Sequence, residues 1–93
     1  MIARATEAAA LLKALPHEGR LMILCHLSGG ERAVGELEQL PGQRQAAVSL
    51  QLARLRADGL ATRRREGKTR LYSIAAPKAA EVIATVYRLF CTE

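Results

Sequence analysis

Apolar residues recur at helical spacing in five stretches of the chain, and glycine and proline separate these stretches. Spacings of three and four residues predict an amphipathic helix in each stretch. The predicted helices cover Ala3–Ala14, Pro16–Ser28, Ala33–Leu40, Arg44–Ala57 and Pro77–Cys91.

A hairpin is predicted between the fourth and fifth helices, where two short strands flank Glu66-Gly67-Lys68. The third and fourth helices are joined by a tight turn at Pro41-Gly42, and Asp58-Gly59 ends the fourth helix. Five helices and two short strands in this order predict a mainly α winged helix-turn-helix, in which the hairpin is the wing. We expect the whole chain, residues 1–93, to form one such domain.

The last predicted helix is apolar on more than one side. Between Lys78 and Cys91 the polar residues fall on one narrow stripe, and the stretch Ala8–Leu12 in the first helix is also apolar. Because a small domain cannot easily bury two sides of a helix by itself, the pattern predicts a twofold dimer. The residues expected at the dimer interface are Leu11, Val82, Ile83, Val86, Tyr87 and Phe90.

The composition excludes several classes of function. Hydrophobic residues make up 49% of the chain, but it has no Trp, one Phe and two Tyr, so base stacking on aromatic side chains is not expected. No apolar run approaches the roughly 20 residues of a membrane span. The segment Met1–Glu7 does not resemble a signal peptide. We therefore expect a cytoplasmic protein that makes no contact with a membrane.

Positive charge is concentrated in the fourth helix and the hairpin. Between Gln43 and Arg70 there are eight basic and two acidic residues, whereas the rest of the chain has six basic and seven acidic ones. That segment therefore carries +6 and the remainder −1, which together give the net charge of +5. Charge this concentrated is typical of a surface that binds a polyanion such as DNA.

The fourth helix has the composition of a recognition helix, which lies in the major groove of DNA. Val48, Leu52 and Leu55 form its apolar stripe, so its other side should face the bases. Glutamine can pair with adenine, serine with either kind of base, and alanine can touch the thymine methyl. An ordinary amphipathic helix would have the same pattern, but the preceding turn and the following basic hairpin favour base reading. The expected base-reading residues are Gln45, Ala46, Ser49, Leu50 and Arg54.

The hairpin, together with the residue before the recognition helix, supplies cations for the DNA backbone. Arginines at a protruding tip suit phosphates and narrow minor grooves. The alternative is a solvated edge strand that charge protects from aggregation. Like charges so close together repel one another without a polyanion, which favours DNA. The residues expected at the backbone are Arg44, Arg63, Arg64, Arg65, Lys68 and Arg70.

Two cysteines are the further candidates for chemistry. Cys25 lies in the second helix and Cys91 at the end of the last. Their spacing leaves open whether they are buried hydrophobic residues or a redox pair. The chain has no CxC, CxxC or paired histidine motif, so no metal site is predicted. Since there is also no Gly-rich phosphate loop, carboxylate pair or Ser-His-Asp set, neither an enzyme nor a cofactor is expected.

Several motifs, in the right order, resemble the ArsR-type (ArsR/SmtB) bacterial repressors. They are Leu12–Leu24, Val34–Glu38, Gln45–Ser49, Gln51–Arg56, Asp58–Leu60 and Arg64–Lys68, and the likeness covers essentially the whole chain. Ile23–Cys25 and Tyr87–Cys91 are similar to the sulfide-responsive BigR/SqrR branch of that family. In that branch reactive sulfur species bridge two cysteines at these positions and DNA is released. The resemblance therefore implies a redox switch formed by Cys25 and Cys91.

The chain also departs from parts of the family. The third helix lacks the cysteine motif of arsenic, cadmium and lead sensors, and the last helix lacks the histidine and aspartate of zinc and nickel sensors. Those metal sites are therefore not carried over. Leu50 stands where relatives often have a polar residue, and Arg44 stands where Ser or Thr usually caps the recognition helix.

The hypothesis from the sequence is a homodimeric repressor that binds a palindromic operator when reduced. A persulfide or polysulfide then bridges Cys25 and Cys91, and the operator is released. One alternative keeps the DNA binding and makes the effector a thiophilic metal or metalloid held by the same thiols. Another is a DNA-binding or partner-binding module with inert, buried cysteines.

Overall fold

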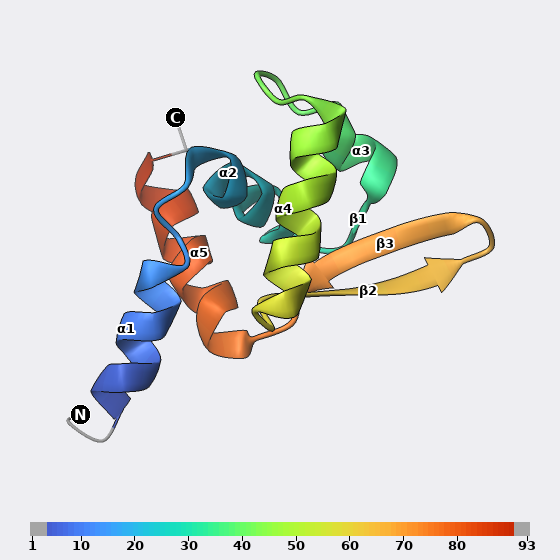
Figure 1. Cartoon of the computed structure of the whole chain (residues 1–93). Helices are drawn as coiled ribbons and strands as arrows, with labels where there is room; N and C mark the ends of the chain where they lie inside the picture. The colour runs from blue at the N-terminus through green and yellow to red at the C-terminus, as the bar shows by residue number, and fades with distance from the viewer. Residues whose placement is uncertain (1–3, 91–93) are drawn as a thin grey trace.

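The computed structural model describes residues 4–90, and its five helices and wing confirm the winged helix-turn-helix (Figure 1). The helices are α1 (Ala5–Lys13), α2 (Glu18–Leu27), α3 (Val34–Glu38), α4 (Gln45–Ala57) and α5 (Pro77–Phe90). The strands are β1 (Arg32–Ala33), β2 (Ala61–Glu66) and β3 (Thr69–Ile74). Each helix lies within its predicted range, while the predicted outer ends, Ala3 and Cys91, fall outside the described residues.

β1 is a strand that the sequence pattern did not predict. It pairs antiparallel with β3, so the sheet has three strands in the order β1-β3-β2 instead of the expected two. With only two residues, β1 is too short to show the alternation by which a strand is identified. Its pairing of Arg32 with Tyr72 fastens the root of the hairpin next to α3.

β2 and β3 form the wing, which a two-residue turn closes at Gly67 and Lys68. Gly67 has a φ of 63°, a left-handed conformation that glycine adopts without strain and that suits the twist of a hairpin. Every residue of β2 after Ala61 is exposed. Figure 1 shows that the wing projects away from the helices, so its charges reach solvent on both faces.

The hydrophobic core lies where α2, α4 and α5 meet beside the root of the sheet. Each fully buried aliphatic side chain contributes about 1.5–3 kcal/mol to folding. The largest of them are Ile23, Leu24, Leu37, Val48, Leu52, Leu55 and Ile83. By contrast, α1 contributes no buried residue and lies at the edge of the molecule. The core therefore fixes α2 and α4 more firmly than it fixes α1.

Candidate nucleic-acid interface

α4 divides its side chains between the core and the solvent. Its buried residues, Val48, Gln51, Leu52 and Leu55, recur at helical spacing. The five residues expected to read bases are all exposed: Gln45, Ala46, Ser49, Leu50 and Arg54. The side of α4 turned away from the core is therefore open to a ligand along the length of the helix.

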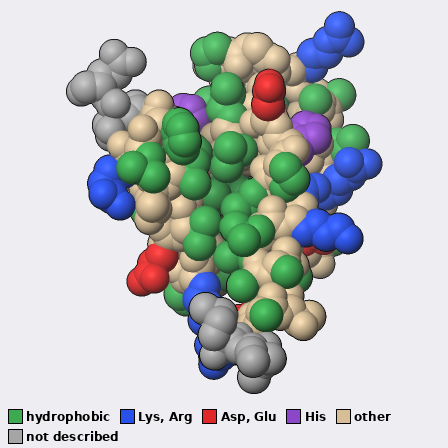
Figure 2. Space-filling view, turned by 90° about the vertical axis from the view of Figure 1, so that its left-hand side faces the viewer, with side chains coloured by type: hydrophobic (Ala, Val, Ile, Leu, Met, Phe, Trp, Pro, Cys, Tyr) green, Lys and Arg blue, Asp and Glu red, His purple; other side chains and the backbone are tan. Residues whose placement is uncertain are grey.

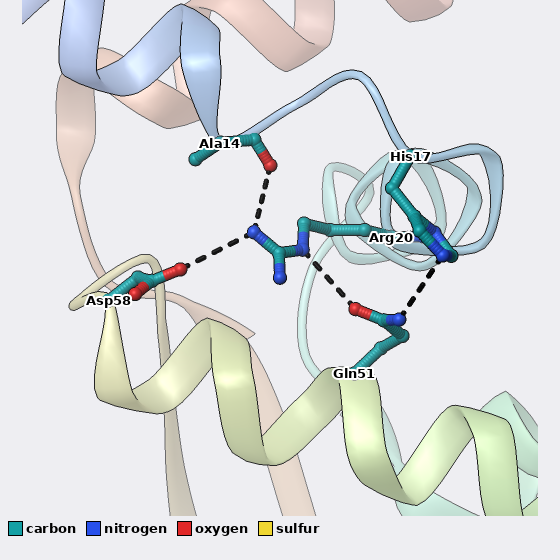
Figure 3. A network of polar contacts seen from close by, with 5 residues as sticks. All are labelled: Ala14, His17, Arg20, Gln51 and Asp58. Carbon is teal, nitrogen blue, oxygen red and sulfur yellow. Dashed lines mark hydrogen bonds and ion pairs between the residues drawn. The ribbon is translucent and has the colours of Figure 1, made fainter.

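A polar network holds α4 against α2 (Figure 3). Arg20 of α2 donates hydrogen bonds to Oε1 of Gln51 at 3.3 Å and to Oδ2 of Asp58 at 3.3 Å. The same side chain donates to the carbonyl oxygen of Ala14 at 3.0 Å. The amide nitrogen of Gln51 also lies 3.3 Å from Nε2 of His17, whose Nδ1 accepts from the first turn of α2.

Burial of the polar groups allows this network to fix the orientation of α4. The side chain of Arg20 is 13% exposed and Gln51 is 5% exposed. Because a polar group left unpaired in such surroundings is costly, a rotation or slide of α4 that broke these bonds would be opposed. The orientation of α4 thus depends on directed hydrogen bonds in addition to apolar packing.

The two faces of the wing have different surroundings, since side chains alternate along each strand. Arg63 and Arg65 of β2 lie opposite Tyr72 and Arg70 of β3, so these four side chains share one face. Arg64 points to the other face. The sequence showed only a cluster of cations, and the strand register is what separates it into two sets.

A basic groove of about 650 Å³ lies between α3, α4 and the face of the wing that carries Arg63 and Arg65. Ser49 of α4 also lines it, so the groove continues into the surface expected to read bases. Of the six residues expected at the DNA backbone, the groove gathers four, and it adds Arg56, which the sequence reasoning missed. The cations that line it are Arg56, Arg63, Arg65, Lys68 and Arg70.

Arg64 is held by two carboxylates on the opposite face. Its Nε and Nη2 donate to the two oxygens of Glu31 at 2.7 and 2.8 Å, and Nη2 lies 3.0 Å from an oxygen of Glu66. The hydrogen bonds from Arg64 lower the pKa of Glu31. The pKa of Arg64 is raised, mostly by the hydrogen bonds to Glu31 and to a smaller extent by the one to Glu66. Arg64 is therefore paired with two carboxylates within the protein. Arg44, the N-cap of α4, is exposed and lies outside the groove lining.

α1 and α5 form a second surface, on which hydrophobic side chains gather across the middle (Figure 2). An apolar groove of about 1030 Å³ runs between α1, α5 and the turn after α4, and Leu11 and Val82 line it. Lys78 reaches from α5 to Glu7 of α1 at 2.9 Å. Exposed apolar side chains on the two helices are Leu12, Tyr87, Leu89 and Phe90. No helix within residues 4–90 is long and apolar enough to cross a membrane.

Ile83 was wrongly assigned to the dimer interface. Its side chain is completely buried in the core of the chain itself. Leu11, Val82 and Val86 are partly buried against that core, whereas Tyr87 and Phe90 are exposed. The periodicity of α5 showed that several of its sides are apolar. It did not show which side the chain covers with its own α2 and β3.

Cys25 is buried in α2, with 8% of its surface exposed, and its carbonyl oxygen accepts a hydrogen bond from the Ser28 hydroxyl at 2.6 Å. α2 packs against α5, the helix that precedes Cys91 in the chain. Cys91 itself lies outside the described residues. Among residues 4–90, no three His, Cys, Asp or Glu side chains gather in a way that could hold a metal ion.

Three residues that organise this surface escaped the sequence reasoning: Arg20, Gln51 and Glu31. Gln51 carried a signal, because it falls within the apolar stripe of α4 between Val48 and Leu52. A glutamine at such a position needs buried partners. Glu31 carried none, since its partner Arg64 lies 33 positions away in the sequence.

Comparison with known proteins identifies a family whose sequence pattern matches about half of this chain. The family described as bacterial regulatory protein, arsR family, matches residues 17–63. The biofilm growth-associated repressor of Agrobacterium fabrum is 49% identical over 88 residues, which are 95% of this chain and 75% of that protein.

Two solved structures share the fold. The transcriptional repressor BigR from Xylella fastidiosa superposes with a TM-score of 0.86 at 44% identity, over 100% of this chain and 95% of its own. A homodimeric winged helix-turn-helix DNA-binding domain from Mycobacterium bovis superposes with a TM-score of 0.75 at 35% identity, over 95% and 82% of the two chains. These relatives are transcriptional regulators and not enzymes.

Proposed function

The chain belongs to the arsR family of bacterial regulatory proteins, and we propose that it is a homodimeric transcriptional repressor that binds a palindromic DNA operator. In this proposal α4 enters the major groove and the wing reaches the adjacent backbone. The observation that carries it is that Ser49 of α4 lines the same basic groove as Arg63, Arg65 and Arg70 of the wing. One duplex can therefore meet the outer side of α4 and these cations together.

The salt dependence of DNA binding tests this assignment. The slope of log affinity against log salt should flatten by about 0.9 for each phosphate contact that Arg65→Gln removes. Lys13→Gln is the matched control, because it removes the same charge from an exposed position on α1, outside the basic groove. Lys13 lines the apolar groove beside α5, so sedimentation should first show that this variant keeps the oligomeric state of the wild type. Equal slopes for Arg65→Gln and the wild type would contradict the role of the groove.

The second part of the proposal is a twofold dimer formed through the α1–α5 surface. Phe90 is 79% exposed and Leu12 60%. Contiguous exposed apolar surface of this kind marks interaction sites. The Mycobacterium bovis relative is itself homodimeric. A twofold axis would place two copies of α4 at half-sites about one turn of DNA apart, roughly 34 Å.

The third part is control of DNA affinity by Cys25 and Cys91. α2 carries both the buried Cys25 and Arg20, whose bonds to Gln51 and Asp58 orient α4. A covalent bond formed at Cys25 therefore acts on the helix that positions the base-reading surface. This link supports the assignment of the switch that the resemblance to the BigR/SqrR branch implies.

Persulfide chemistry can supply that bond. One cysteine thiolate attacks the outer sulfur of a small persulfide, and the carrier leaves as a thiolate. The second thiolate attacks the new cysteine persulfide, forms a disulfide and expels hydrosulfide. Where both cysteines have become persulfides, the terminal sulfur of one attacks the inner sulfur of the other, which gives a trisulfide bridge and again expels hydrosulfide. Because Cys25 is buried, we expect Cys91 to be attacked first and Cys25 to close the bridge.

Intact mass and DNA release together test the switch. Cys25→Ser and Cys91→Ser should each bind DNA as the reduced wild type does. Polysulfide should not release either variant from DNA, because a bridge needs both thiols. In the wild type, loss of both thiols with or without added sulfur is expected. An added arsenic after arsenite treatment would favour a metalloid effector, and unchanged thiols would favour inert cysteines. DNA release by treated Cys91→Ser would contradict the two-thiol switch.

A further inference from the structure

The ion pair between Arg64 and Glu31 joins two segments that are not neighbours in the sheet. Glu31 directly precedes β1, Arg64 lies on β2, and β3 runs between these two strands. On β3, Leu71 pairs with Arg64 on one side and with Ala33 on the other. The pair therefore spans the middle strand, on the face of the wing turned away from the basic groove.

Backbone pairing supports only the root of the wing from the side. β1 pairs with β3 at two residues, Arg32 and Ala33, so beyond Leu71 the wing is a two-stranded ribbon. Such ribbons are strongly twisted and marginally stable alone. The bond to Glu31, which precedes the start of β1, adds a tie to Arg64, which pairs with Leu71 where the third strand ends.

The charge of Arg64 is already matched within the protein. Glu31 and Glu66 contact the same guanidinium, so the three side chains together carry one net negative charge. A phosphate at this place would have to displace a carboxylate that accepts two short hydrogen bonds. Two parallel bonds from one guanidinium to one carboxylate also restrict their relative orientation, which a single contact does not.

We propose that Arg64 and Glu31 are positioning residues that fix the angle of the wing relative to α4, and that Arg64 does not contact DNA. This inference rests on the proposed DNA binding. The angle sets the width of the basic groove, and so decides whether Arg65 and Arg70 meet phosphates while α4 occupies the major groove. Exposed ion pairs add little to folding stability, so the effect falls on DNA affinity and hardly on unfolding.

Glu31→Gln separates positioning from charge. It removes a negative charge, so electrostatics alone would tighten DNA binding, whereas loss of the tie should weaken binding about threefold to tenfold. Arg64→Gln changes the net charge in the opposite direction and should give a loss at least as large. The double variant should lose no more than Arg64→Gln, because both substitutions remove one interaction. Affinity is measured on a duplex of roughly 30 base pairs selected from a random library by the reduced wild type, long enough for two half-sites.

Arg65→Gln is the matched control, since Arg65 is the next residue on β2 and points into the basic groove. It should flatten the salt dependence of binding, whereas Glu31→Gln and Arg64→Gln should keep the wild-type slope. Thermal unfolding should show that all three variants fold like the wild type. Unchanged or tighter binding by Glu31→Gln, or a flattened slope for Arg64→Gln, would overturn the inference. A wild type without salt-dependent DNA binding would instead refute the proposed function.

Discussion

The α4–wing surface and the α1–α5 surface both leave side chains exposed, but of opposite kinds. The first presents mostly polar side chains on α4, with Leu50 as an exposed apolar exception, and the cations of the basic groove. The second presents large apolar side chains, among them Leu12, Leu89 and Phe90. Each surface therefore suits a different partner. The first suits the bases and phosphates of DNA, and the second suits another apolar surface.

The two surfaces also differ in how firmly the chain holds them. α4 is fixed by four buried residues and by the bonds from Arg20 to Gln51 and Asp58. α1 has no buried residue, and Leu11 and the ion pair between Glu7 and Lys78 connect it to the body. A recognition element needs to be rigid before it meets its ligand. A dimerisation element can gain its remaining burial from the partner.

The largest expected effect comes from placing charge on the apolar surface. Tyr87→Glu combined with Phe90→Glu should give monomers, since carboxylates would be desolvated at the interface. Operator affinity should then fall toward the non-specific level, about a thousandfold or more below specific binding. Sedimentation velocity and duplex binding measure the two effects. Thr85→Glu, at an exposed polar position of α5, should remain dimeric, and a double variant that also stays dimeric would place the interface elsewhere.

A smaller effect should distinguish the core side of α5 from its exposed side. Ile83→Ala leaves a cavity in the core and should lower the free energy of unfolding by about 2–5 kcal/mol. Urea denaturation measures this change, while sedimentation under native conditions should still show the dimer. An Ile83→Ala protein as stable as the wild type, but monomeric, would return Ile83 to the interface.

The smallest of the three effects concerns base reading on α4. Gln45→Ala or Ser49→Ala should cost roughly 1–3 kcal/mol of binding free energy on the operator and little on random DNA. Both side chains are exposed, so the unfolding transition should not move. Competition between the operator and a random duplex gives the ratio directly. Equal losses on both duplexes would show that these residues position the helix on the backbone instead.

The sequence predicted the helices and the wing because periodicity and turn residues are local signals. The exposed side of α4 followed from the same periodicity, by removal of the stripe that includes Val48 and Leu55. Long-range partners were not predictable in this way. The burial of Ile83, the short strand β1 and the bond between Arg64 and Glu31 all depend on segments far apart in the chain.

The wing shows most clearly that contacts between distant segments could not be predicted from the sequence. In the sequence, Arg63, Arg64 and Arg65 are three equivalent cations. In the sheet, a period of two residues sends the middle one to the opposite face, where it meets Glu31. A run of like charges therefore predicts a charged element, while the role of each charge depends on register and on what covers each face.

Different residues of α4 serve folding and the proposed base reading, so such a regulator can change its DNA target without changing its fold. The residues that attach α4 to the body are Val48, Gln51, Leu52 and Leu55, and none of them belongs to the set proposed to read bases. Substitutions at Gln45, Ala46 or Ser49 therefore leave the folding contacts of the helix intact. Duplicated copies of the gene could acquire new target sequences by a few exposed replacements, each with little effect on stability. Engineering of altered specificity can follow the same route, with the buried half of the helix kept as a constant frame.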